Sequence, residues 1–140
     1  MKGVYILLFR IIKDFSRSVG SLGRVHFEKG NYAYVGSAQS SLIPRLERHY
    51  AKKKRVRWHI DYLTTSKNTR IEGAVYSVAT KKIECRLSAM LSNFSKAVPS
   101  FGSTDCRCRS HLFVLNVPWK DATSSIIKIY NKLGLVPMLC

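Results

Sequence analysis

Gly3-Val4-Tyr5 and Tyr34-Val35-Gly36-Ser37-Ala38 are two short stretches in which a glycine and a tyrosine lie together within apolar sequence. A glycine allows close approach to the backbone, and a tyrosine adds a phenol that can donate or accept a hydrogen bond. Arg45 and His49 follow the second stretch at a spacing that places both on one face of a helix. Two phenols beside a cationic helix predict the beginning of a phosphate-handling site.

The composition predicts a single domain with a polyanionic partner. The chain has 140 residues, of which 46% are apolar, which suits one domain over residues 1–140 with one core. Its 24 Lys and Arg against 8 Asp and Glu give a formal charge of +16. Nucleic acid fits this charge better than a membrane, because no run approaches the roughly 20 apolar residues of a membrane span and no signal-peptide pattern opens the chain. The composition predicts no particular oligomeric state.

The cysteines predict reduced thiols in a cytoplasmic protein, since four are few for a disulfide framework in a chain of this size. Cys106-Arg-Cys108-Arg-Ser-His111 offers three candidate ligands at short spacing, whereas a structural zinc site usually has four. Cys85 is the nearest additional thiol, but its expected place on the polar side of a helix argues against convergence. We therefore expect buried or merely local thiols rather than a zinc site, with His111 as a structural hydrogen-bonding residue.

Hydrophobic periodicity divides the chain into short strands and amphipathic helices. Residues 3–12, 23–28 and 32–36 are expected to form a three-strand antiparallel meander, joined by turns over 16–21 and 29–31. Further strands are expected over 71–79 and 111–117. Helices are expected from Ser40 or Ser41 onward with Leu42, Ile43, Leu46 and Tyr50 facing the core, over 57–63, over 83–94, and from Ala122 to Leu133.

Glu84 is the carboxylate that this pattern singles out. The helix over 83–94 has one buried stripe, formed by Ile83, Leu87, Met90, Leu91 and Phe94. At roughly 100° per residue, Glu84 falls at the edge of that stripe. A carboxylate in this position is held by a packed helix and can face a cleft.

Taken together, these residues resemble the GIY-YIG nuclease domain over nearly the whole chain. The signature tripeptides stand at residues 3–5 and 34–36, and the run from Tyr34 to His49 resembles the second strand and first helix of that family. Glu84 stands where the metal-binding glutamate of the family is expected. Residues 57–63 and 102–112 further resemble a prokaryotic, archaeal-type branch that is sometimes fused to endonuclease III.

The resemblance implies an α+β fold with a small, mostly antiparallel central sheet flanked by helices, and a metal-dependent endonuclease that hydrolyses DNA in repair or recombination. Glu84 would bind Mg²⁺ or Mn²⁺ together with phosphate oxygens of the substrate. Arg45 would hold the phosphate in a bidentate manner. Tyr5 would take or relay the proton of the attacking water if its pKa were lowered, Tyr34 would position that network, and His49 would share the proton transfer.

The basic residues beyond Arg45 are expected to hold the DNA backbone: Arg48, Lys52, Lys53, Lys54, Arg55 and Arg57. Asp105 is a second-site candidate that could orient neighbouring arginines or approach the metal. The late asparagine of the family has no secure match, and the long separation of Tyr5 from Tyr34 predicts a longer first hairpin. The alternatives are a non-catalytic basic nucleic-acid-binding module on the same scaffold and an RNA- or ribosome-associated factor.

Overall fold

The strand β1 (Gly3–Ile11) is the centre of the molecule, and Arg10 is its only exposed residue. In the computed structural model, which describes residues 2–103 and 106–140, it lies between β4 (Gly30–Ala38) and β5 (Thr69–Ser77). The six-stranded sheet has the order β6-β7-β4-β1-β5-β8, and each of these pairings is antiparallel. The short outer strands are β6 (Ser95–Ala97), β7 (Leu112–Leu115) and β8 (Met138–Leu139).

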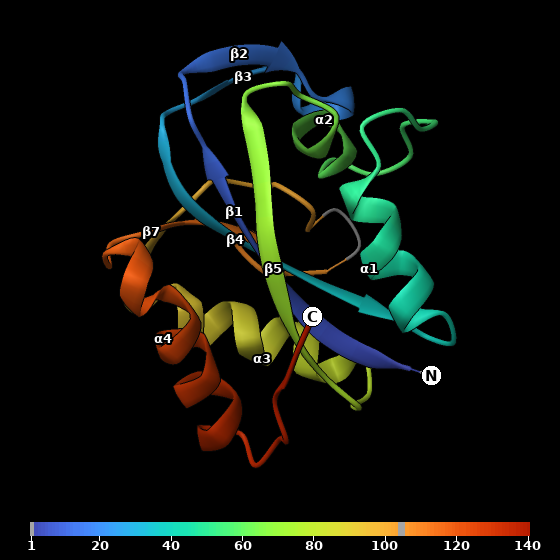
Figure 1. Cartoon of the computed structure of the whole chain (residues 1–140), viewed down its shortest axis with the longest axis vertical. Coiled ribbons are helices and arrows are strands. Elements are labelled where there is room, and N and C mark those ends of the chain that lie inside the picture. Colours follow the sequence, from blue (N-terminus) through green and yellow to red (C-terminus); the bar gives the residue numbers. More distant parts are fainter. Residues whose placement is uncertain (1, 104–105) are drawn as a thin grey trace.

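Alternate side chains of β1 enter two cores, one on each face of the sheet. The helices are α1 (Leu42–Tyr50), α2 (Asp61–Thr64), α3 (Lys82–Leu91) and α4 (Trp119–Lys132). The face that carries Tyr5 packs against α1 and α2, and the face that carries Val4 packs against α3 and α4 (Figure 1). The expected α+β fold, with helices flanking an antiparallel sheet, is confirmed. No helix within the described ranges has the length and apolar character needed to cross a membrane.

The predicted three-strand meander is wrong, because β1 pairs with β4 directly. The intervening residues form a separate hairpin in which β2 (Phe15–Ser18) pairs with β3 (Arg24–Phe27), with the 3-10 helix η1 (Gly20–Leu22) at its tip. Period-two alternation identifies a strand without identifying its partner. Phe27 is buried, and its ring lies 5.3 Å from that of Phe15, so the hairpin packs on itself and on the core. This hairpin accounts for the long separation of the two tripeptides.

Several helices differ from the sequence prediction in extent or facing, and α3, expected over 83–94, ends at Leu91. α2 is shorter than the helix expected over 57–63, because residues 58–60 form a bend and turns ahead of it. In α1 the buried positions are Leu42, Leu46 and His49, so Tyr50, one residue further round the helix, is 44% exposed rather than facing the core. His49 takes the inward position instead.

Candidate functional site

A cleft of about 360 Å³ opens beside the C-terminal half of β4. β7 pairs with β4 only from Tyr32 to Tyr34, so the described strands leave the edge of β4 uncovered from Gly36 onward. The lining residues come from both faces of the sheet: Tyr5, Tyr34, Gly36, Ser37, Arg45, Arg57, Trp58, His59, Lys81, Glu84 and Gly102. Tyr5, Tyr34, Arg45 and Glu84, four of the five predicted catalytic residues, therefore share one cleft.

Tyr5 lies directly across Gly36 on the neighbouring strand. A Cβ atom built on Gly36 would collide with the Cζ and Oη atoms of Tyr5, so the phenol ring occupies the space that a side chain would need. The glycine of the second tripeptide thus allows the tyrosine of the first to cross the sheet toward the cleft. The two tripeptides form a single structural unit.

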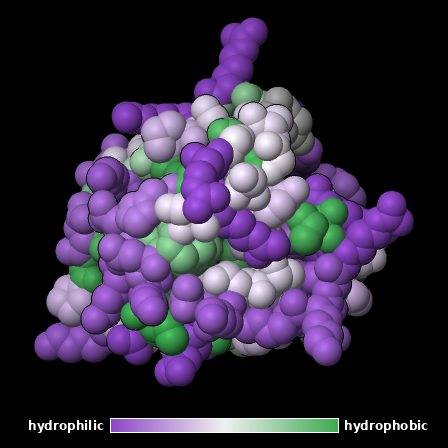
Figure 2. All heavy atoms as spheres, turned by 90° about the horizontal axis from the view of Figure 1, so that it is seen from above, coloured by the Kyte–Doolittle hydropathy of each residue, from purple (hydrophilic) through white to green (hydrophobic). Residues whose placement is uncertain are grey.

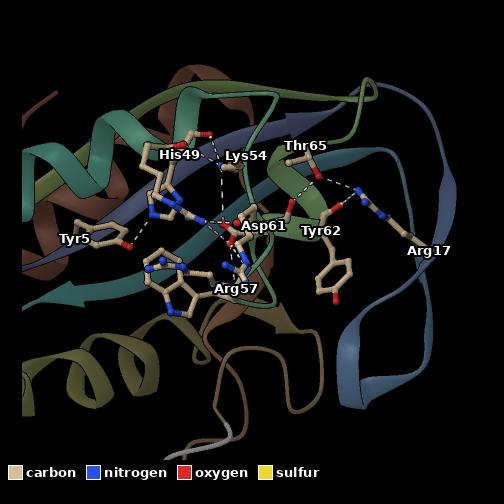
Figure 3. Close-up of polar contacts among 11 residues, drawn as sticks. Tyr5, Arg17, His49, Lys54, Arg57, Asp61, Tyr62 and Thr65 are labelled. Atoms are coloured by element: carbon tan, nitrogen blue, oxygen red, sulfur yellow. Dashed lines mark hydrogen bonds and ion pairs between the residues drawn. The ribbon is translucent and has the colours of Figure 1, made fainter.

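His49 lies behind Tyr5 rather than in the cleft. Its Nε2 atom is 2.7 Å from the Tyr5 Oη atom, and both residues are buried (Figure 3). Burial, followed by the Tyr34 phenol, raises the pKa of Tyr5 well above 10.0, and the nearby Arg45 only partly offsets this. Burial and the Lys54 cation lower the pKa of His49 to about 4. At neutral pH the pair is therefore a protonated phenol beside a neutral imidazole.

This pair predicts a loss of stability in mild acid. The pKa of His49 falls from 6.5 in the unfolded chain to about 4 in the folded protein, so the unfolded chain binds more protons between these values. The free energy of unfolding should fall by about 3 kcal/mol as the pH drops from 6.5 to 4. Urea unfolding at several pH values measures this slope, which His49→Gln should reduce and His26→Gln, whose histidine side chain is 57% exposed, should leave unchanged. Equal slopes in all three proteins would contradict the assignment.

Arg45 is held at the mouth of the cleft by two contacts. Its Nη1 atom donates a hydrogen bond to the Ser37 carbonyl oxygen, and its guanidinium lies 4.7 Å from the centre of the Trp58 ring. These contacts orient the planar guanidinium and leave several of its five N–H groups for an anionic ligand. Trp58 itself also lines the cleft.

Glu84 faces the same cleft from the first turn of α3, with a side chain that is 11% exposed. Its Oε2 atom accepts a hydrogen bond of 2.6 Å from the Ser37 hydroxyl. Its Oε1 atom lies 2.8 Å from Nδ1 of His111, an ion-pair distance without the alignment of a regular hydrogen bond. An ionised carboxylate has about four lone-pair directions, so two remain for a ligand.

Asp61 organises much of the basic segment that was expected to hold DNA. Its fully buried carboxylate accepts two hydrogen bonds from Arg48, at 2.9 and 3.0 Å, and lies 3.8 Å from Nζ of Lys54. Backbone N–H groups of Arg57 and Trp58 complete its shell (Figure 3). Arg48 and Lys54 are thus engaged inside the protein.

The remaining predicted DNA-binding residues differ in their surroundings. The ammonium group of Lys52 donates to the Ser66 and Thr69 carbonyl oxygens. Lys53 and Arg55 are exposed, and Arg57 is exposed and lines the cleft. Hydrophilic side chains cover most of the face shown in Figure 2, as the charge of +16 leads one to expect.

A second group of ligand-type side chains lies behind Glu84. The sulfur atoms of Cys85, Cys106 and Cys108 and a ring nitrogen of His111 all lie within 4.8 Å of one another and could hold a metal ion. The expectation that Cys85 does not converge with the others is wrong, because the loop before β7 passes over the side of α3 that carries Cys85. All four cysteines of the chain are free thiols. Burial raises the pKa of both Cys85 and Cys108.

Several site residues were not predicted from the sequence. His59 and Gly102 both line the cleft, and the backbone N–H of Gly102 donates to Nδ1 of His59 at 3.0 Å. The two segments singled out by the resemblance, 57–63 and 102–112, thus meet at the cleft. No asparagine among residues 2–103 and 106–140 lines it, and Asp105 lies outside the described residues.

Comparison with known proteins places the chain in one family. No curated protein and no solved structure matches it. One family matches residues 4–135, which is nearly the entire chain. The protein therefore belongs to the family described as domain of unknown function DUF123.

Proposed function

We propose that this protein is a metal-dependent endonuclease of the GIY-YIG type that hydrolyses phosphodiester bonds in DNA, with repair or recombination as its setting. The proposal rests on one observation: Tyr5, Tyr34, Arg45 and Glu84 come from four separate elements and line one cleft. These residues come from elements on both faces of the sheet. Packing of the two cores alone would not require two phenols, a guanidinium and a carboxylate to line the same cleft.

The charge distribution supports a nucleic-acid substrate. Lys53, Arg55 and Arg57 are exposed on the loop between α1 and α2, and Arg57 reaches the cleft. A DNA backbone lying along this loop would neutralise these cations and bring one phosphate to Arg45. Because these contacts reach only phosphates, we expect recognition of DNA shape rather than base sequence.

Glu84 suits a divalent cation such as Mg²⁺ or Mn²⁺. Mg²⁺ is commonly held by one or two carboxylates together with substrate phosphate oxygens, and Glu84 keeps two lone-pair directions for such a ligand. The bound ion would supply charge neutralisation at the phosphate and a nucleophile at neutral pH. Arg45 would bind a phosphoryl oxygen and stabilise the charge that grows on it in the transition state.

Tyr5 and His49 would move the proton of the attacking water. Tyr5 has a pKa raised well above 10.0, so it does not act as a free phenolate. A proton relay does not need a phenolate. Tyr5 would accept a proton from water as it passes its own proton to His49, whose imidazole is neutral at physiological pH. Tyr34, which lines the same cleft, would orient the water and phosphate.

The test is a plasmid-nicking assay, extended to branched and flap DNA, with and without Mg²⁺ or Mn²⁺. Arg45→Ala should lower the cleavage rate by about a hundredfold, because it removes a charged donor to the developing oxyanion. Arg70→Ala, which removes an exposed arginine outside the cleft, is the matched control and should cleave at nearly the wild-type rate.

Two outcomes would contradict the proposal. Cleavage that persists in excess chelator would exclude a dependence on divalent metal. A protein that binds DNA with normal salt dependence but cleaves no substrate would instead be a non-catalytic nucleic-acid-binding module.

A further inference from the structure

The group formed by Cys85, Cys106, Cys108 and His111 lies immediately beside the proposed catalytic carboxylate. Three of these residues come from the loop that leads into β7, and the fourth comes from the first turns of α3. The loop has no regular secondary structure from Cys106 to Ser110. Something other than a strand or helix ladder must therefore hold this loop against α3.

The spacing of the four ligand atoms is compatible with a tetrahedral metal site. A tetrahedral Zn²⁺ ion with ordinary Zn–S and Zn–N bonds separates a sulfur from a nitrogen by about 3.6 Å. The Cys106 sulfur lies 3.5 Å from Nε2 of His111, and all four ligand atoms fall within 4.8 Å of one another. The three cysteines are free, so no disulfide brings their sulfur atoms to the imidazole.

The ligand chemistry selects the ion. Thiolate ligands are soft and suit Zn²⁺, whereas Mg²⁺ and Mn²⁺ prefer oxygen. With three cysteines and one histidine, all four positions of a tetrahedral zinc ion come from the protein, which is the arrangement of structural rather than catalytic zinc sites.

The imidazole of His111 connects this group to the cleft. Its Nε2 atom faces the thiol of Cys106, and its Nδ1 atom lies 2.8 Å from Oε1 of Glu84. A metal bound at Nε2 fixes the proton on Nδ1, where it can be donated to the carboxylate. Ser37 donates to the other oxygen of Glu84, so each carboxylate oxygen has one polar side chain beside it.

We propose that Cys85, Cys106, Cys108 and His111 bind one Zn²⁺ ion, and that this ion holds the Glu84 carboxylate in the cleft through His111. Glu84 and Cys85 are neighbours on α3, so the same helical turn supplies the zinc site and the cleft. The zinc assignment is independent of the proposed nuclease activity, whereas the role of Glu84 as an anchor for a second metal rests on it. His111 is in this scheme a positioning residue.

The zinc content of the 140-residue protein, purified without chelator, tests whether the four residues bind zinc. Wild type and Cys140→Ser, whose exposed cysteine is outside the group, should contain one Zn²⁺ per chain, and Cys108→Ser should contain less. Cobalt exchanged into wild type should show thiolate charge-transfer absorption and the strong visible bands of tetrahedral Co²⁺. Wild-type protein without zinc, and without these cobalt bands, would overturn the assignment even if the cysteine variants did not fold.

His111→Cys tests whether the zinc site holds Glu84 through His111. This variant can retain four zinc ligands, but it lacks the nitrogen that faces Glu84. The readout is Mn²⁺ binding by electron paramagnetic resonance, with Glu84→Gln defining the part that depends on Glu84. His111→Cys should weaken that part by about tenfold, the lower end of the effect of an outer-shell partner on a metal site. Unchanged Mn²⁺ affinity would overturn the link, whether or not the variant keeps its zinc.

The two proposals fail in different ways. Cleavage by a protein that holds no zinc would leave the nuclease proposal standing and remove the zinc site. Stoichiometric zinc in a protein without Glu84-dependent Mn²⁺ binding would keep the zinc site, and would contradict both the proposed catalysis and the link to Glu84.

Discussion

Glu84→Gln should lower the rate of DNA cleavage by a factor of about a thousand. The substitution keeps the size of the side chain and leaves one carbonyl oxygen that can accept the hydrogen bond from Ser37, but it replaces the other oxygen with an amide donor and removes the charge that a divalent cation needs. Losing one preorganised charge at a phosphoryl-transfer site costs about a hundredfold to a thousandfold, and the upper end applies where that charge anchors the metal. Initial rates of plasmid nicking at saturating Mg²⁺ measure the effect.

DNA binding and zinc content serve as internal controls for Glu84→Gln. Its zinc content should equal that of wild type, because Glu84 is not one of the four proposed zinc ligands. Fluorescence anisotropy at several salt concentrations should give wild-type affinity and salt dependence, because the phosphate-binding cations are untouched. Glu47→Gln removes an exposed carboxylate from α1 and should cleave normally. Wild-type cleavage by Glu84→Gln would eliminate Glu84 as the metal anchor.

Asp61→Ala should lower the free energy of unfolding by about 3–5 kcal/mol. The carboxylate is fully buried, and its removal leaves Arg48 and the nearly buried Lys54 without their anionic partner. Breaking a buried ion pair from one side is costly because the remaining charge keeps its desolvation penalty. Denaturant unfolding measures the loss. Asp121→Ala, an exposed carboxylate in the first turn of α4, should cost less than about 1 kcal/mol.

The contribution of Asp61 should also have its own pH window. Burial raises the pKa of Asp61, but hydrogen bonds from Arg48 and from the N–H groups of Arg57 and Trp58 outweigh it, so the pKa lies below 3.8. A carboxylate with a depressed pKa stabilises the fold fully above its unfolded value and loses that stabilisation as the pH falls through the folded value. The stability difference between wild type and Asp61→Ala should therefore be constant at neutral pH and shrink only below about pH 4. A difference that shrinks between pH 7 and 5 would contradict this account.

The sequence was sufficient to predict the elements that form the cleft. β1 is identifiable because its residues from Val4 to Phe9 form an apolar run, and Glu84 because the stripe of α3 leaves it at a boundary. Arg45 follows from its spacing after the second tripeptide. These features depend on local periodicity, which a single sequence displays directly.

The long-range features could not be predicted because they depend on where loops travel. Cys85 joins the other three ligands only because the loop before β7 crosses α3, and helical periodicity alone gives no information about that path. The basic residues of α1 and of the loop after it look equivalent in the sequence, and only the folded structure distinguishes Arg48 and Lys54, which Asp61 engages, from exposed Arg55. The partner of β1 was missed for the same reason.

The packing of Tyr5 over Gly36 has a consequence for how such chains can diverge. The ring at position 5 fills the volume above position 36, so a side chain at 36 requires the ring to move or to be lost. Substitution of Gly36 while Tyr5 is present therefore meets a steric barrier, whereas the same substitution after loss of the ring does not. The two tripeptides are far apart in the sequence, yet a change in one alters which residues the other can accept.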